Sequence, residues 1–268
     1  MFGEARRMRG ECKETVMRKP ILRWSWALVF FMVPFSGRSA DDLRTRADAA
    51  WAARETPAQT LLAIQLYEQL AAKNPADKAV RIRLAQAASW AFEQDPKMGN
   101  DKVVQIMDKG IKACKEILAQ NEDDPEANYW LMWDMAGRTL ARGVFSGFAF
   151  KEALVATIMV AKSDIGYQYG GVYCYWAIVI NTLPNLLGRF FHFSNDDAVW
   201  LYQRAVALEP RYLRSRFFLG VSYEVAGKKA EARKEYQFCI SQPDDALPEA
   251  IPENKLYREL AKETILKL

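Results

Sequence analysis

The sequence has one histidine, His192, and lacks the residue patterns on which common catalytic sites depend. It contains no G-x-S-x-G element, no H-E-x-x-H pair and no glycine-rich phosphate loop. A lone histidine between phenylalanines is more often a packed or surface residue than a general base. We therefore expect a protein that is not an enzyme, with no catalytic residue and no cofactor.

Cysteine is also scarce, with four in 268 residues. None lies in a C-x-x-C pair or at a metal-ligand spacing, so no metal site is expected. Cys114 and Cys239 fall at helix packing positions, where cysteine acts as a small apolar residue.

An excess of positive charge is missing once the first 40 residues are set aside. These hold eight Lys or Arg and three acidic residues, a net charge of +5 against +4 for the whole chain. The remaining residues therefore carry about −1, which excludes a basic surface for nucleic acid.

The first 40 residues have the pattern of a secretory leader. Met17, Arg18 and Lys19 form a positive start, residues 24–34 are an uncharged apolar run, and small residues follow up to Ala40. We expect a signal peptide that begins at Met17 and is removed, which leaves residues 41–268 as a single TPR-like domain in the periplasm. The alternative is an uncleaved anchor helix, but the run is shorter than the roughly 20 residues that span a bilayer.

The most informative segment runs from Leu219 to Cys239 and predicts a tetratricopeptide (TPR) helix hairpin. Spacings of three and four residues place its large and small side chains on one face. Gly220 would face Ala232 and let the two helices approach closely, and Gly227 would make the turn between them. The packing residues predicted here are Leu219, Gly220, Tyr223, Ala232 and Tyr236.

Two other segments share a four-point pattern with offsets of four, seven and twelve residues. One is Ala63, Tyr67, Leu70 and Pro75, and the other is Ala198, Tyr202, Ala205 and Pro210. The simpler alternative is that any amphipathic helix that ends at proline would show this pattern. Because one hairpin cannot bury its face alone, the copies together predict an all-α fold of stacked TPR-like hairpins, an α-solenoid.

No segment alternates with period two, so no strand is expected. The predicted array has an enlarged, aromatic-rich middle and a C-terminal capping helix. Asp196 and Asp197 are expected at a helix start, with Asn195 as the cap. The expected helices span residues 41–54, 57–73, 77–92, 101–119, 127–141, 150–162, 172–181 and 253–268, and the regular repeats resume at residue 195 and end near residue 240.

Aromatic residues gather in the middle, and residues 165–188 contain no charge. A membrane span is disfavoured because Gly170, Gly171 and Pro184 interrupt the segment. The alternatives left open are core packing and a cleft, channel or subunit interface, for which tyrosine and tryptophan are suited. The candidate ligand or interface residues are Tyr129, Trp130, Trp133, Tyr169, Tyr173, Trp176, Phe190 and Phe191.

Several of these segments resemble the T component of TRAP transporters, the TatT family. The segments that carry the resemblance are residues 125–130, 169–173, 183–184, 197–212 and 252–262, together with the Leu219–Gly220 hairpin. The resemblance implies a periplasmic helical protein that pairs with an extracytoplasmic solute receptor. It also implies a homo-oligomer, in the described case a trimer, with a cavity for a hydrophobic small molecule. The alternative is a general periplasmic TPR adaptor for proteins or peptides, with no transporter link.

Overall fold

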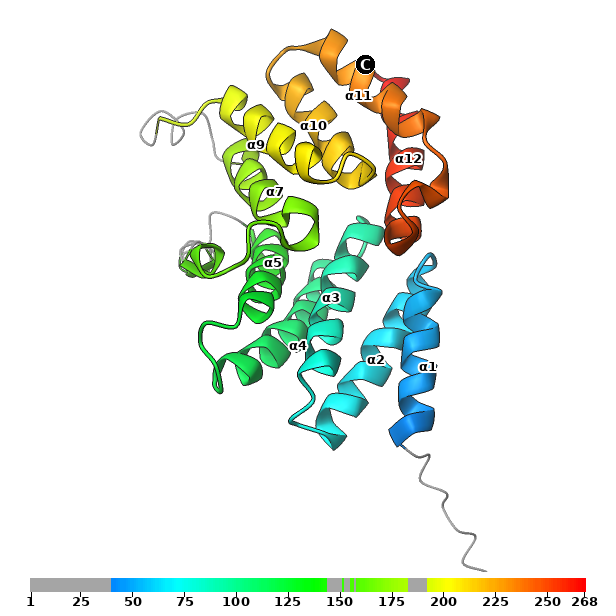
Figure 1. The fold of residues 1–268 in the computed structure, drawn as a ribbon, viewed down its shortest axis with the longest axis vertical. Coiled ribbons are helices and arrows are strands. Elements are labelled where there is room, and N and C mark those ends of the chain that lie inside the picture. The colour runs from blue at the N-terminus through cyan, green and yellow to red at the C-terminus, as the bar shows by residue number, and fades with distance from the viewer. Residues whose placement is uncertain (1–39, 144–150, 152–154, 157, 183–191) are drawn as a thin grey trace, which may run out of the picture. The chain divides into compact units, whose positions relative to one another are not determined.

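The computed structural model describes residues 40–143, 151, 155–156, 158–182 and 192–268. The chain divides after Gly37, and every helix described here belongs to the unit Arg38–Leu268. Regular structure in the described residues is helical throughout and includes no strand, which confirms the all-α prediction. With the labels of Figure 1, the helices are α1 (Ala40–Ala52), α2 (Pro57–Lys73), α3 (Lys78–Gln94), α4 (Asn100–Leu118), α5 (Pro125–Arg142), α7 (Tyr167–Thr182), α9 (Asn195–Leu208), α10 (Leu213–Val225), α11 (Lys229–Ser241) and α12 (Ile251–Ile265), with 3-10 turns at Asp244–Ala246 and Pro248–Ala250.

Helices that follow one another in the chain pack against one another, as in a stack of hairpins (Figure 1). Helices α1 to α5 form one such series, and α7 to α12 form another. The large and small residues of the repeats are buried as predicted: Ala63 and Ala198 are fully buried, and so are the rings of Tyr67 and Tyr202. The stacked TPR-like architecture is therefore confirmed.

The hairpin of α10 and α11 has one close contact that the sequence did not predict. A Cβ atom added to Gly220 would lie 2.6 Å from the ring of Tyr236, so the glycine makes room for this tyrosine. Leu219, Ala232 and Tyr236 are buried, whereas Tyr223 is partly exposed and its hydroxyl accepts a hydrogen bond from Gln203.

The helix caps correct one sequence prediction. Asp124 caps α5 by accepting a hydrogen bond from the backbone N–H of Ala127 at 3.0 Å. The cap of α9 is Ser194 and not Asn195. Ser194 and Asp197 form a capping box, in which each side chain satisfies a backbone N–H of the other.

The predicted break at the paired glycines of the middle segment is present in α7. Gln168, Tyr169 and Gly170 have φ values of 50°, 59° and 78°, so right-handed helix begins only after them. The next residue, Gly171, lies directly under the ring of Tyr129, where a Cβ atom would overlap the tyrosine hydroxyl. One glycine therefore permits a left-handed conformation, and the other permits close packing.

Candidate functional site

A cleft of about 700 Å³ lies where the two ends of the helical array meet. Its walls come from the end of α1, the first half of α3, the starts of α5 and α7, and the segment that leads into α12. Four aromatic rings line it: Trp51, Tyr167, Tyr169 and Tyr212. The rings of Tyr169 and Tyr212 lie 4.5 Å apart, which joins α7 to the start of α10.

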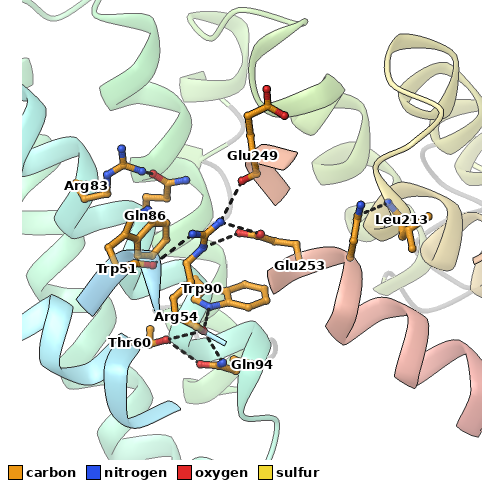
Figure 2. Close-up of polar contacts among 11 residues, drawn as sticks. Trp51, Arg54, Thr60, Arg83, Gln86, Trp90, Gln94, Leu213, Glu249 and Glu253 are labelled. Carbon is orange, nitrogen blue, oxygen red and sulfur yellow. Dashed lines mark hydrogen bonds and ion pairs between the residues drawn. The ribbon is translucent and has the colours of Figure 1, made fainter. Parts of the chain in front are cut away.

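Arg54 connects the two ends of the array through its side chain (Figure 2). Its guanidinium donates to both carboxylate oxygens of Glu253, at 3.1 and 2.9 Å, although the two residues are 199 positions apart in sequence. It also donates to the backbone oxygens of Trp51 at 3.3 Å and Glu249 at 3.2 Å. Four contacts thus hold one guanidinium, and a bidentate pair of this kind has a defined geometry.

The backbone oxygen of Arg54 is equally well satisfied. It accepts hydrogen bonds from Trp90 Nε1 at 3.0 Å, Gln94 Nε2 at 2.8 Å and Thr60 Oγ1 at 3.3 Å (Figure 2). These donors come from α3 and α2. The turn after α1 is therefore fixed on one side by α3 and on the other side by α12.

Glu253 is itself buried, and burial raises the pKa of its carboxyl above the ordinary glutamate value. The Arg54 guanidinium acts in the opposite direction but does not compensate for the lost hydration. The pair therefore fixes where α12 lies against α1, and its contribution to stability is smaller than its geometry suggests.

Trp51 lies between two guanidinium groups at the wall of the cleft. The Cζ atom of Arg54 is 4.4 Å from the centre of the ring and that of Arg83 is 5.3 Å. Cations are attracted to the negative face of an aromatic ring. Arg83 also donates from Nη1 to Gln86 Oε1 at 2.7 Å, one turn along α3 (Figure 2).

The left-handed turn at the start of α7 forms another wall of this cleft, through Gln168 and Tyr169. A left-handed conformation costs a residue with a side chain roughly 1–2 kcal/mol. Strain of this kind persists only where surrounding contacts impose it, and it is concentrated at binding sites. The turn directs residues of the aromatic middle into the cleft.

A second cleft, of about 320 Å³, lies between α3, α4, α5, α7 and α10 and is almost entirely apolar. Its lining includes Phe92, Met107, Trp133, Ile178 and Phe218. A much smaller space of about 50 Å³, lined by Gln86, Ser89 and other residues, lies between α3 and α5 and shares residues with both clefts.

Glu93 and Arg214 lie at the boundary between the small space and the apolar cleft. Arg214 is buried and donates to Glu93 at distances of 2.6 to 3.1 Å, and the hydroxyl of Tyr257 donates to Glu93 at 2.7 Å. The guanidinium also stacks on Trp133 at 4.8 Å. This network is a second connection between α3 and the C-terminal helices.

The structure brings some of the predicted aromatic residues to the clefts and places others elsewhere. Tyr169 lines the large cleft, while Tyr129, Trp130 and Trp133 line the small space, and Trp133 also lines the apolar cleft. Tyr173 and Trp176 are partly buried against the core and line none of the three. Phe190 and Phe191 lie outside the described residues.

Sequence reasoning missed Trp51, Arg54, Arg83 and Glu253. Trp51 and Arg83 lie on helices whose sequences are typical of ordinary repeat helices, and Arg54 lies in the turn after α1. Glu253 was predicted only as part of a capping helix. Among the described residues, no group of histidine, cysteine or acidic side chains is arranged to hold a metal ion. In the same part of the chain, each helix is too short or too polar to cross a membrane.

Stacked hairpins that enclose a cleft between the ends of the array define a TPR-like helical-repeat protein. The family model described as Regulator of microtubule dynamics protein 1-3 matches residues 43–250. The chain belongs to this family. This match supports the resemblance to the T component of TRAP transporters at the level of a TPR-like helical family.

The solved structures that are similar to this chain include two that are 16% identical to it. One is titled "Crystal structure of MamA", with a TM-score of 0.40, and covers 86% of this chain and 98% of its own. The other is titled "Crystal structure of MamA protein", with a TM-score of 0.34, and covers 81% of this chain and 94% of its own. No curated protein matches the chain.

Proposed function

We propose that the protein is a non-catalytic helical-repeat adaptor that binds part of a partner protein in the large cleft. The observation that carries this proposal is the cleft itself, about 700 Å³ of space at the junction of the array ends. This volume lies within the range of pockets that enclose a small ligand or a short peptide. Rings, amides and charged groups line it together, a mixture that suits a peptide better than an apolar molecule.

The leader sequence supports an extracytoplasmic location, and we propose the periplasm. The name of the family concerns microtubule dynamics. A microtubule partner would require the mature chain to be in the cytosol. Fractionation of cells that express the full chain distinguishes the two locations, because a signal peptide would be removed on export.

The apolar cleft favours a second candidate function, the one implied by the resemblance to the T component. In that case the protein pairs with an extracytoplasmic solute receptor, assembles as a homo-oligomer such as a trimer, and holds a hydrophobic small molecule. The observation in favour is the lining of Phe92, Met107, Ile178 and Phe218 around about 320 Å³. Apolar side chains that surround an open space are stabilised when an apolar ligand fills it.

The test is crosslinking of the native chain followed by identification of its partners. Ala79 is exposed and lines the large cleft, so Ala79→Trp places a ring in the cleft without removing a buried contact. Ala207 is an exposed alanine of α9 that lies outside the cleft, and Ala207→Trp is the matched control.

We expect Ala79→Trp to abolish the crosslinks and Ala207→Trp to preserve them. Crosslinks that survive both substitutions would rule out the large cleft as the binding site. A captured solute receptor, together with a trimer in a native-size measurement, would favour the second candidate over the first.

A further inference from the structure

Arg83 differs from the other cations that line the large cleft, because no acidic side chain pairs with it among the described residues. A guanidinium has five N–H donors. In the described part of the chain Arg83 uses one of them, in its hydrogen bond to Gln86 Oε1 at 2.7 Å. About four donors are therefore left to water or to a ligand.

The two other cations of the cleft are paired with acidic side chains. Arg54 makes four hydrogen bonds, two of them to Glu253. The ammonium of Lys78 lies 2.7 Å from Asp124 and 2.8 Å from Glu126. These contacts hold helices together. The unused donors of Arg83 have no such role.

The Arg83 side chain is also held in place before any ligand arrives. Its guanidinium lies 5.3 Å from the centre of the Trp51 ring, and Gln86 fixes one of its terminal nitrogens. Part of the entropy that a long side chain loses on binding has therefore been lost already on folding. The remaining edge of the planar group has the geometry that matches the two oxygens of a carboxylate.

The charge of the cleft favours a carboxylate over a phosphate. The three cations are balanced by Glu126, Glu249 and Glu253, which line the same space. A phosphate carries more negative charge than a carboxylate and would be repelled more strongly by these acids. The Arg54–Glu253 pair forms one wall of the cleft.

We propose that Arg83 binds the C-terminal carboxylate of the partner protein, an inference that rests on the adaptor function proposed above. The carboxylate accepts two hydrogen bonds from the guanidinium beside Trp51. The preceding residues of the partner lie against the paired rings of Tyr169 and Tyr212. Arg83 is thus the residue that selects for a chain end.

The probe is a mixture of tripeptides attached to beads by their amino ends. Three sets of beads are compared: one has free carboxyl ends, one has amidated ends, and one ends in an amidated phosphoserine. We expect the full chain to be retained by the free carboxyl ends alone. Arg83→Gln should weaken retention by about tenfold or more, as expected for loss of charged hydrogen bonds. Arg83→Lys keeps the charge without the planar group and should fall between the two.

Arg233→Gln is the matched control, since Arg233 is exposed on α11 and lies outside the cleft. It should bind like the wild type. A thermal melt of each variant shows that the fold is kept. Soluble acetate at millimolar concentration should not compete with the beads for the protein, whereas a tripeptide with a free carboxyl end should. Equal competition by acetate would indicate that the ligand is a small carboxylic acid and would overturn the assignment to a chain end.

Four results would each overturn the proposal. They are equal retention on amidated beads, retention by phosphoserine alone, no retention on any beads, and unchanged retention of the Arg83→Gln variant. The proposed adaptor function is judged separately by the crosslinks. If Ala79→Trp removes them and Arg83→Gln does not, the cleft binds the partner without using a carboxylate. If neither substitution removes them, the adaptor proposal fails as well.

Discussion

Replacing Glu253 tests whether the ends of the helical array are joined as the structure describes. Glu253→Ala removes both carboxylate contacts of the Arg54 guanidinium and leaves that charge buried. Loss of one partner of a buried ion pair typically costs about 3–5 kcal/mol. Because Arg54 keeps the backbone oxygens of Trp51 and Glu249 as acceptors, we expect the lower end, about 3 kcal/mol.

The control is the neighbouring ion pair between Lys255 and Glu55, which joins the same two parts of the chain at 2.8 Å. Both side chains of this pair are more than one-third exposed, so Lys255→Ala should cost no more than about 1 kcal/mol. Glu253→Gln should cost less than Glu253→Ala, since the raised pKa of Glu253 means that the fold tolerates an uncharged side chain there.

The assay is unfolding in urea followed by tryptophan fluorescence, which reports on Trp51 and Trp90 beside Arg54. A loss of about 3 kcal/mol corresponds to roughly 6–12 °C in Tm for a domain of this size. Equal effects of Glu253→Ala and Lys255→Ala would refute the reasoning, because the buried contact would then contribute no more than a solvated one.

Two further substitutions test the packing of the repeats. Gly220→Ala places a Cβ atom 2.6 Å from the Tyr236 ring and should lower the unfolding free energy by about 1–3 kcal/mol. Gly166→Ala is the control and should be close to neutral, because its Cβ atom would meet only Asp164 at 3.5 Å. Equal effects of the two substitutions in a urea titration would contradict the packing described for Gly220. Asp134 is fully buried, and burial raises the pKa of its carboxyl far above the usual value, so folding favours the protonated form and stability should fall as pH rises above about 4. Asp134→Asn should remove this part of the pH dependence, and Tm values from pH 5 to 8 with the same slope as the wild type would count against it.

The regular repeats could be predicted from the sequence, because their spacing encodes local packing. The offsets from Ala63 to Tyr67 and from Ala198 to Tyr202 correspond to one turn of helix, and these residues are buried as expected. The capping box at Ser194 was missed because Asn195, next to it, is an equally good capping residue. Local rules alone do not choose between two adjacent candidates.

The large cleft could not be predicted, because it is formed by residues far apart in the chain. Trp51 and Arg83 meet Glu253 only when the ends of the array come together, and no periodicity of three or four residues encodes that contact. The aromatic middle was a partial signal. It led to Tyr169, which lines the cleft, but equally to Trp176, which packs against the core.

The contact between Arg54 and Glu253 also has a consequence for how the array unfolds. An open array of repeats loses its terminal helices first, because each repeat is supported only by its neighbours. Here the turn after α1 and the start of α12, which are the two ends of the described array, support each other across 199 positions of sequence, so we expect them to fray together. The two ends are expected to behave as one cooperative unit. Closure over such a distance costs chain entropy, which places it late in folding, after the local hairpins have formed.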